Sequence, residues 1–202
     1  VTGVQTCALP ILKITKVETV RNREPIPLPE PWLPAWSAPG GTHATSFGFS
    51  FHRVYTDEGI VGIGPDTGAS PRMLLGVDPF TVGEFWDQHM SGRQPNRSGR
   101  RAAGLEIALW DIVGKAASAP ISKLLGRRRD RIPVYAATSR LLETEQHVRQ
   151  VTELAALGYK AVKLRLHRQN PWDDVAVVEA VREAVGDELT LLVDANQNNN
   201  SP

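Results

Sequence analysis

The sequence contains a single cysteine, Cys7, among its 202 residues, so an internal disulfide is excluded. It also has almost no net charge, because 23 Lys and Arg residues stand against 22 Asp and Glu residues. That balance leaves no overall field to recruit nucleic acid or an anionic membrane. No run approaches the roughly 18 apolar residues of a membrane span, and the first residues lack the order of a signal peptide. We therefore expect a cytoplasmic protein that binds neither nucleic acid nor membrane.

The remaining composition is that of an ordinary globular protein. Hydrophobic residues make up 41% and charged residues 22% of the chain, with 17 Gly and 15 Pro. These values argue against disordered, collagen-like and coiled-coil classes. A chain of this length can bury a sufficient core without disulfides or a structural metal.

The two ends of the chain differ from the rest. Residues 1–11 (VTGVQTCALPI) carry no charge and show neither strand nor helix periodicity. They resemble the translation of a common sequencing-library adapter, and we interpret them as a non-native segment. Residues 196–202 (NQNNNSP) directly follow an apolar strand-like run. We therefore expect the sequence to break off within a domain.

The first half of the chain predicts a small antiparallel sheet followed by a packed helix. Alternating patterns predict strands over residues 12–20, 46–55 and 60–64. The proline-rich residues 25–42 predict a long loop that carries Trp32 and Trp36. A helical apolar stripe, with an exposed i, i+4 ion pair beside it, then follows. The stripe consists of Leu105, Leu109, Ile112 and Ala116, and the pair of Asp111 and Lys115.

The second half alternates strands and helices. We predict strands over 132–138, 161–166 and 189–194, and helices over 143–157 and 173–185 that each end at a glycine. Short connections between such elements imply parallel strands and right-handed crossovers. The sequence thus predicts one domain over residues 12–131 and another over 132–202.

Two local patterns are interpreted structurally. The Gly62-Ile63-Gly64 run is followed by proline and opens no helix, so we expect a strand end and not a phosphate-binding loop. The arginines of residues 127–129 predict a solvated turn between domains, because the surrounding charge is balanced.

Chemistry concentrates at the ends of the last two predicted strands. Alternation places Lys163, Arg165 and His167 on one face of the strand, which is unusual for a buried parallel strand. One interpretation is an edge strand with a solvated face. The other is a ligand site, because Asp194 and Asn196 follow the next strand and α/β sheets place ligands at the carboxyl ends of their strands.

These residues stand within an ordered series of motifs that resembles the enolase superfamily, in its mandelate racemase and muconate lactonizing enzyme branch. The resemblance extends from Leu12 to about Gln197. The motifs are TDEG at 56–59, GIG at 62–64, AGLEIALWDIVGK at 103–115, PISKLLG at 120–126, IPVY at 132–135, AVKLR at 161–165 and VDAN at 193–196.

The resemblance implies an α+β capping domain followed by a modified TIM barrel, here represented by its first three strands. It further implies a bound Mg²⁺ and abstraction of the proton alpha to a substrate carboxylate, which gives an enediolate. Lys163 matches the first Lys of the family's Lys-x-Lys motif, and Asp194 matches the first of three acidic metal ligands. Trp32 and Trp36 would lie on a lid over the substrate, with His167 and Asn196 near it.

Arg165 departs from the family pattern, which has a second Lys at this position. Arginine keeps its proton at working pH but binds carboxylates through two parallel hydrogen bonds. We therefore expect a dehydratase of sugar acids or hydroxy acids, which needs one strong base. A racemase, epimerase or cycloisomerase using Lys163 is the alternative, and an acid-binding homologue without chemistry is another.

A complete barrel takes about 250 residues, whereas 202 − 131 = 71 residues follow Arg131. We therefore expect the chain as given to be an inactive fragment of an enzyme that is a homo-oligomer at full length.

Overall fold

A computed structural model describes residues 12–35, 37, 41–90 and 97–195 of the chain. The fold divides into two compact units. The first comprises the chain up to Pro25 together with Gly48–Asp130, and the second comprises Ile26–Phe47 together with the chain from Arg131 on. The sequence prediction had assigned all of residues 12–131 to one domain, and its domain bounds stay a prediction.

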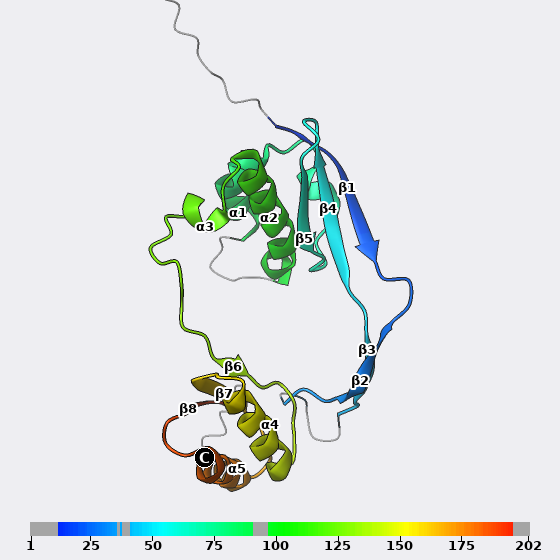
Figure 1. Cartoon of the computed structure of the whole chain (residues 1–202). Helices are drawn as coiled ribbons and strands as arrows, with labels where there is room; N and C mark the ends of the chain where they lie inside the picture. The colour runs from blue at the N-terminus through cyan, green and yellow to red at the C-terminus, as the bar shows by residue number, and fades with distance from the viewer. Residues whose placement is uncertain (1–11, 36, 38–40, 91–96, 196–202) are drawn as a thin grey trace, which may run out of the picture. The chain divides into compact units, whose positions relative to one another are not determined.

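The first unit contains a three-stranded antiparallel sheet in the order β1-β4-β5 (Figure 1). Its strands are β1 (Ile14–Arg21), β4 (Ser50–Thr56) and β5 (Val61–Pro65). The tight turn between the last two contains Gly59 at a φ of 79°, a left-handed conformation that favours glycine. The structure confirms the predicted meander, except that the predicted strand 46–55 is interrupted at Gly48 and Phe49.

Helices and short turns cover one face of this sheet. They are η1 (Pro71–Leu74), η2 (Pro79–Thr81), α1 (Val82–His89), α2 (Arg97–Ala116) and α3 (Ile121–Leu124). The predicted stripe residues Leu105, Leu109 and Ile112 on α2 are fully buried in the core of the unit. The predicted ion pair forms as well, with Lys115 Nζ 2.7 Å from Asp111 Oδ2.

The Gly62-Ile63-Gly64 run forms part of β5, as predicted, and its glycines allow α2 to approach closely. A Cβ atom on Gly64 would lie 2.0 Å from the carbonyl oxygen of Gly104 in α2. A Cβ on Gly62 would lie 2.4 Å from the carbonyl oxygen of Ala108. Because both obstacles are backbone atoms, only glycine permits this packing of strand against helix.

Part of the predicted loop over residues 25–42 is a strand, which corrects the sequence expectation. β2 (Ile26–Trp32) pairs with β3 (Ala44–Phe47) in a separate two-stranded antiparallel sheet. Prolines at 27, 29 and 31 alternate along β2, so their missing N–H groups can face an outer edge of the ladder. The pattern that excluded a central strand is compatible with this peripheral one.

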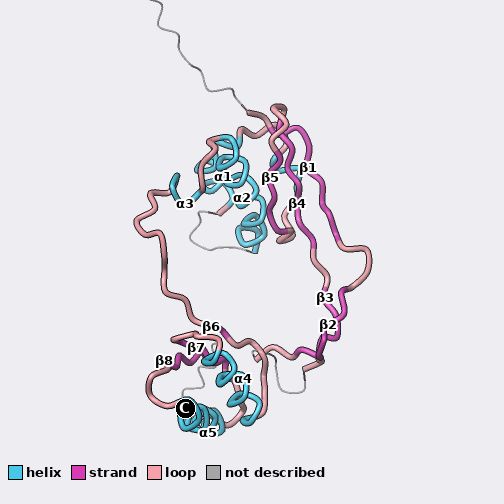
Figure 2. Tube along the Cα trace, in the orientation of Figure 1, coloured by secondary structure: helices cyan, strands magenta, loops and turns pink. Residues whose placement is uncertain are grey.

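The second unit also contains a parallel sheet in the order β6-β7-β8, formed by β6 (Ala136–Ala137), β7 (Ala161–Arg165) and β8 (Thr190–Asp194). α4 (Thr144–Ala156) and α5 (Pro171–Val185) connect the strands, and Figure 2 shows this alternation. Both helices contribute to the core beneath the sheet, with Val151 of α4 and Val177 of α5 fully buried against Val162 and Leu164.

The predicted helices, and the strands β7 and β8, are confirmed to within a few residues. The predicted strand 132–138 is shortened to two residues. Ile132 and Val134 lie outside it and are 71% and 66% exposed. None of the helices in the described ranges is long and apolar enough to cross a membrane.

Candidate active site

The candidate site begins with the alternation of side chains along β7. Val162 and Leu164 point into the core under the helices and are fully buried. Lys163 and Arg165 therefore lie on the opposite face, and their side chains are 24% and 31% exposed. β7 is paired on both sides, with β6 and with β8. The edge-strand interpretation is therefore wrong, and two cations lie on the central strand of the sheet.

Asp194 brings a carboxylate to these cations from the neighbouring strand. It lies opposite Arg165 in the parallel register of β7 and β8. Lys163 Nζ is 2.8 Å from Asp194 Oδ2, and Arg165 Nη2 is 3.9 Å from the same oxygen. All three side chains are about a quarter to a third exposed, so a ligand could reach them. The structure brings these three predicted residues together at the carboxyl ends of β7 and β8.

A residue that sequence reasoning missed supports this arrangement. Thr138, just after β6, is 3% exposed, and its hydroxyl donates to the carbonyl oxygen of Lys163 at 3.2 Å. The backbone N–H of Arg165 donates to the same Thr138 hydroxyl at 3.1 Å. On the other side of β7, the N–H of Leu166 donates to the carbonyl of Asp194 at 3.1 Å. The end of β7 is thus held from both sides.

The loop after β7 holds His167 and Arg168. His167 is half-buried, and its Nδ1 atom has no hydrogen-bond partner within the described part of the chain. Arg168 instead stabilises the fold, because its guanidinium pairs with Asp174 of α5 at 3.0 Å and donates to the carbonyl of Leu142 at 2.5 Å. Of these two residues, His167 remains the candidate for ligand contact.

Of the other three predicted substrate contacts, only Trp32 lies within the described residues. Trp32 is half-buried at the end of β2, within the second unit. Trp36 and Asn196 lie outside the described residues. Their assignment as substrate contacts, like that of His167, stays a prediction.

Asp194 fits a Mg²⁺ site in its chemistry, as one ligand among several. Mg²⁺ prefers carboxylate and other oxygen ligands in octahedral geometry and usually keeps some water. Asp194 offers a partly exposed carboxylate at a strand end. Among the described residues, no three His, Cys, Asp or Glu side chains cluster so as to hold a metal ion. Further ligands would have to come from elsewhere.

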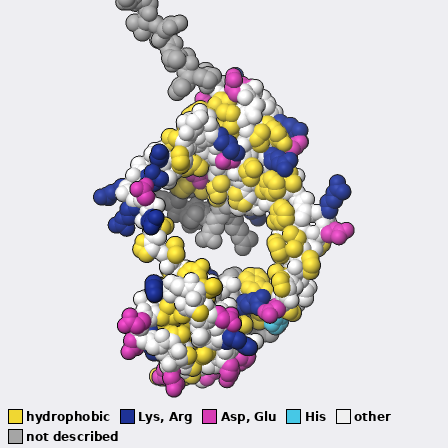
Figure 3. Space-filling model, viewed as in Figure 1, with side chains coloured by type: hydrophobic (Ala, Val, Ile, Leu, Met, Phe, Trp, Pro, Cys, Tyr) yellow, Lys and Arg dark blue, Asp and Glu magenta, His cyan; other side chains and the backbone are white. Residues whose placement is uncertain are grey.

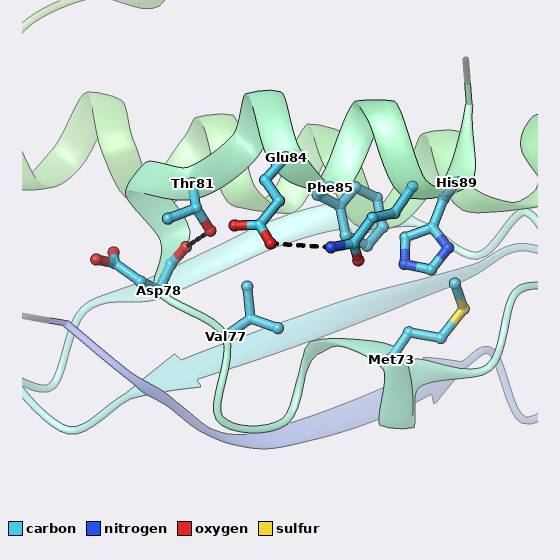
Figure 4. Close-up of a pocket in the computed structure, with 8 residues that line it drawn as sticks. Met73, Val77, Asp78, Thr81, Glu84, Phe85 and His89 are labelled. Carbon is cyan, nitrogen blue, oxygen red and sulfur yellow. Dashed lines mark hydrogen bonds between the residues drawn. The ribbon is translucent and has the colours of Figure 1, made fainter.

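The first unit has a hollow of about 390 Å³ between α1 and the segment before it (Figure 4). Figure 4 shows Glu84 and His89 on the helix facing Met73 and Val77 across this space. None of the predicted site residues lines it, so we do not assign the predicted chemistry to it.

Comparison with known proteins gives family matches in both halves of the chain. Residues 71–126 match the family model of the mandelate racemase / muconate lactonizing enzyme N-terminal domain, and residues 146–202 match an enolase C-terminal domain-like model. An L-talarate/galactarate dehydratase of Salmonella typhimurium is 33% identical over 156 residues, which cover 74% of this chain and 38% of the relative.

Two solved structures are similar in fold. An enolase superfamily member from Polaromonas sp. JS666 has a TM-score of 0.74 at 31% identity, covering 91% of this chain and 52% of that chain. A racemase from Streptomyces coelicolor A3(2), solved with bound magnesium, has a TM-score of 0.75 at 27% identity, covering 91% and 55%. Other matching relatives include a cycloisomerase, a racemase and an epimerase, and no single activity is favoured among them.

The fold and these similarities thus define an enolase-like protein, with an α+β capping domain followed by the first part of a modified TIM barrel. The chain belongs to the mandelate racemase and muconate lactonizing enzyme branch of the enolase superfamily. It spans about two fifths to one half of the length of the relatives and solved structures that it matches.

Proposed function

We propose that the whole protein is a Mg²⁺-dependent enzyme that abstracts the proton alpha to a carboxylate, and that it dehydrates a sugar acid or a related hydroxy acid. The observation that carries this proposal is the cluster of Lys163, Arg165 and Asp194 at the carboxyl ends of adjacent parallel strands. Ligands of α/β folds bind at such strand ends. Negative charge that develops on the substrate carboxylate would be stabilised by cations already held in place there.

Each residue of the cluster has a distinct task in this proposal. Lys163 can exchange a proton at its Nζ, so it is the candidate acid/base for the alpha position. Arg165 keeps its proton and binds a carboxylate oxygen pair, which orients the substrate. Asp194 would hold Mg²⁺ as one of its ligands, and the bound ion would supply Lewis-acid stabilisation of the substrate carboxylate.

Arg165 favours dehydration over racemisation. Racemisation by two bases needs a proton-exchanging group on each side of the alpha carbon, and arginine is a poor base. Loss of a β-hydroxyl needs one base and an acid. The relatives include dehydratases as well as racemases, epimerases and cycloisomerases, so the distinction rests on Arg165 and requires a direct test.

The proposed partner is a small carboxylate and not a polymer. The formal charge is +1, and Figure 3 shows both basic and acidic side chains on the visible face. Such a surface offers no extended field of one sign to attract nucleic acid or an anionic membrane. The cytoplasm is the location that we propose for this enzyme.

The test is turnover of a panel of aldonic and aldaric acids by the whole protein with Mg²⁺, in deuterated solvent. A dehydratase releases a 2-keto acid that carbonyl reagents detect, whereas a racemase or epimerase washes deuterium into recovered substrate. Binding without either product would indicate the acid-binding homologue and would refute the proposal.

Substitution of the cluster gives the first residue-level prediction. Lys163→Ala should lower kcat about 100-fold or more, because the proton-exchanging ammonium is lost. Lys160→Ala is the matched control, since Lys160 is an exposed lysine directly before the start of the same strand. Kinetic constants and thermal unfolding of both variants are compared. A Lys163→Ala enzyme with near-parental kcat would contradict the assignment.

A further inference from the structure

The segment between β6 and α4 is contacted from three directions within the second unit. Thr138, at its start, is bonded to the backbone of Lys163 and Arg165. Leu142, near its end, accepts a hydrogen bond from the Arg168 guanidinium, which is itself paired with α5. Residues 139–141, in between, are bonded to the chain that follows β2. The placement of this segment therefore affects the candidate site directly.

The contact with the β2–β3 hairpin is a short antiparallel pairing. Pro34 forms a bridge with Arg140. The Ala35 N–H donates to the carbonyl of Ser139 at 3.0 Å, and the Leu141 N–H donates to the carbonyl of Leu33 at 3.1 Å. Ala35 is fully buried at this junction. Two backbone hydrogen bonds thus join the hairpin to the residues that directly follow Thr138.

An ion pair reinforces the same junction. The guanidinium of Arg140 pairs with the carboxylate of Glu30 in β2. The Arg140 side chain is 29% exposed, whereas that of Glu30 is 71% exposed, so the pair lies at the surface. Exposed pairs contribute modestly to stability and are weakened by salt. The Arg140–Glu30 pair therefore adjusts how firmly residues 139–141 are held, because the two backbone hydrogen bonds remain when the pair is broken.

We propose that Arg140 is a positioning residue for substrate binding. By pairing with Glu30, it clamps the β2–β3 hairpin onto residues 139–141. It thereby holds Trp32, two residues beyond Glu30 in β2, relative to the segment whose Thr138 is bonded to the backbone of Lys163 and Arg165. This inference rests on the proposed function for its kinetic consequence. The clamp itself is a property of this chain and can be tested without turnover.

Amide hydrogen exchange tests the clamp in the chain itself. In Arg140→Met and in Glu30→Gln, the amides of Ala35 and Leu141 should exchange about two- to five-fold faster, the range expected from losing an exposed ion pair. Amides of β7 should be unaffected. The double variant Glu30→Arg/Arg140→Glu should restore slow exchange. Arg21→Met is the control, because it removes an exposed arginine that pairs with Asp66 in the other unit.

Kinetics of the whole protein test the positioning role. Arg140→Met should raise KM about two- to five-fold with kcat within about two-fold, and the charge-swapped double variant should restore KM. A role confined to stability would leave KM unchanged.

The clamp would be overturned if amide exchange were unchanged in Arg140→Met, or if the charge-swapped double variant did not restore slow exchange. A loss of kcat with unchanged KM would overturn the positioning role. If the parental protein turned over no acid, the proposed function would fail, and the exchange experiment would still decide the clamp.

Discussion

At the residue scale, the buried hydroxyl of Thr138 helps to hold the candidate site. Thr138 accepts the N–H of Arg165 at 3.1 Å and donates to the carbonyl of Lys163 at 3.2 Å. β6 is only two residues long, and beyond Ala137 the backbone N–H of Thr138 donates to the carbonyl of Lys163 at 2.9 Å beside the two bonds of its hydroxyl. The backbone at the end of β7 is thus held in part by a residue that has no place in the sequence motif.

Thr138→Val should destabilise the second unit by about 1 to 3 kcal/mol. Valine has the same shape but no acceptor, so the amide of Arg165 loses its partner in a partly buried position. Thr138→Ser keeps the hydroxyl and should cost less. Urea unfolding, followed with a probe in the second unit, compares the two variants. Equal losses in both would mean that the methyl group, and not the hydroxyl, provides the stability.

His147 makes stability depend on pH. Its side chain is fully buried in α4, and neither ring nitrogen has a hydrogen-bond partner among the described residues. The pKa of His147 is lowered to about 4, chiefly by burial and also by the nearby Arg168 guanidinium, whereas the Asp174 carboxylate acts in the opposite direction. The unfolded chain binds this proton at an ordinary pKa of about 6.5, so stability is fully present above that pH.

As the pH falls from about 6.5 to about 4, the unfolded state gains this proton before the folded state does, and about 3 kcal/mol of stability should be lost. Below about pH 4 both states bind the proton, so the loss of stability due to His147 grows no further. His147→Leu should remove it, and His43→Leu, at an exposed histidine, is the control. Urea unfolding across this pH range measures the difference. A His147→Leu profile parallel to that of the parent would contradict the prediction.

At the scale of elements, the approach of α2 to β5 is limited by glycine. Gly64→Ala would place a Cβ 2.0 Å from the backbone oxygen of Gly104, so the helix must shift. We expect a loss of about 1 to 3 kcal/mol or more. Gly83→Ala in α1 is the control, because no atom lies within 4 Å of the added Cβ and alanine favours helix. Thermal unfolding should separate the two variants, and similar melting temperatures would contradict the close packing.

The elements differ in how far the sequence predicts them. Periodicity predicted α4, α5 and β7, because each buries one face against its neighbours within the same unit. β8 was predicted from its apolar run, although only Leu191 of that strand packs against the core. The strand expected over residues 132–138 was too long, since an apolar run alone does not say whether a partner strand extends beside it. β2 was missed because its prolines exclude a central strand and were taken to exclude any strand.

The residues of the candidate site also differ in how far the sequence predicts them. Lys163, Arg165 and Asp194 were predicted from strand alternation and from strand order, which are local properties of the chain. Thr138 and Arg140 could not be, because their partners lie 25 and 110 residues away in sequence. Nothing in the local pattern around Thr138 and Arg140 indicates which strand or hairpin they contact.

At the scale of the whole molecule, the charge balance and the exposed apolar side chains together favour self-association. In the second unit, Val193 is 53% exposed and Leu192 38% exposed on β8, a strand with no partner on its outer side in the described part of the chain. Unpaired strand edges with apolar side chains are templates for association. The sequence pI is about 8.1, so near that pH little net charge opposes contact between copies.

We therefore expect the 202-residue chain to sediment above its monomer mass of 22.1 kDa as concentration rises, most strongly near pH 8.1. Val193→Lys should weaken association roughly ten-fold, because it removes a valine contact of about 1.5 kcal/mol and adds a charge at the edge. Leu75→Lys is the matched control, since Leu75 is 50% exposed but lies in the first unit. Sedimentation velocity and circular dichroism distinguish dissociation from unfolding. If both lysine variants dissociated equally, added charge alone would account for the effect, and the edge of β8 would not be the contact.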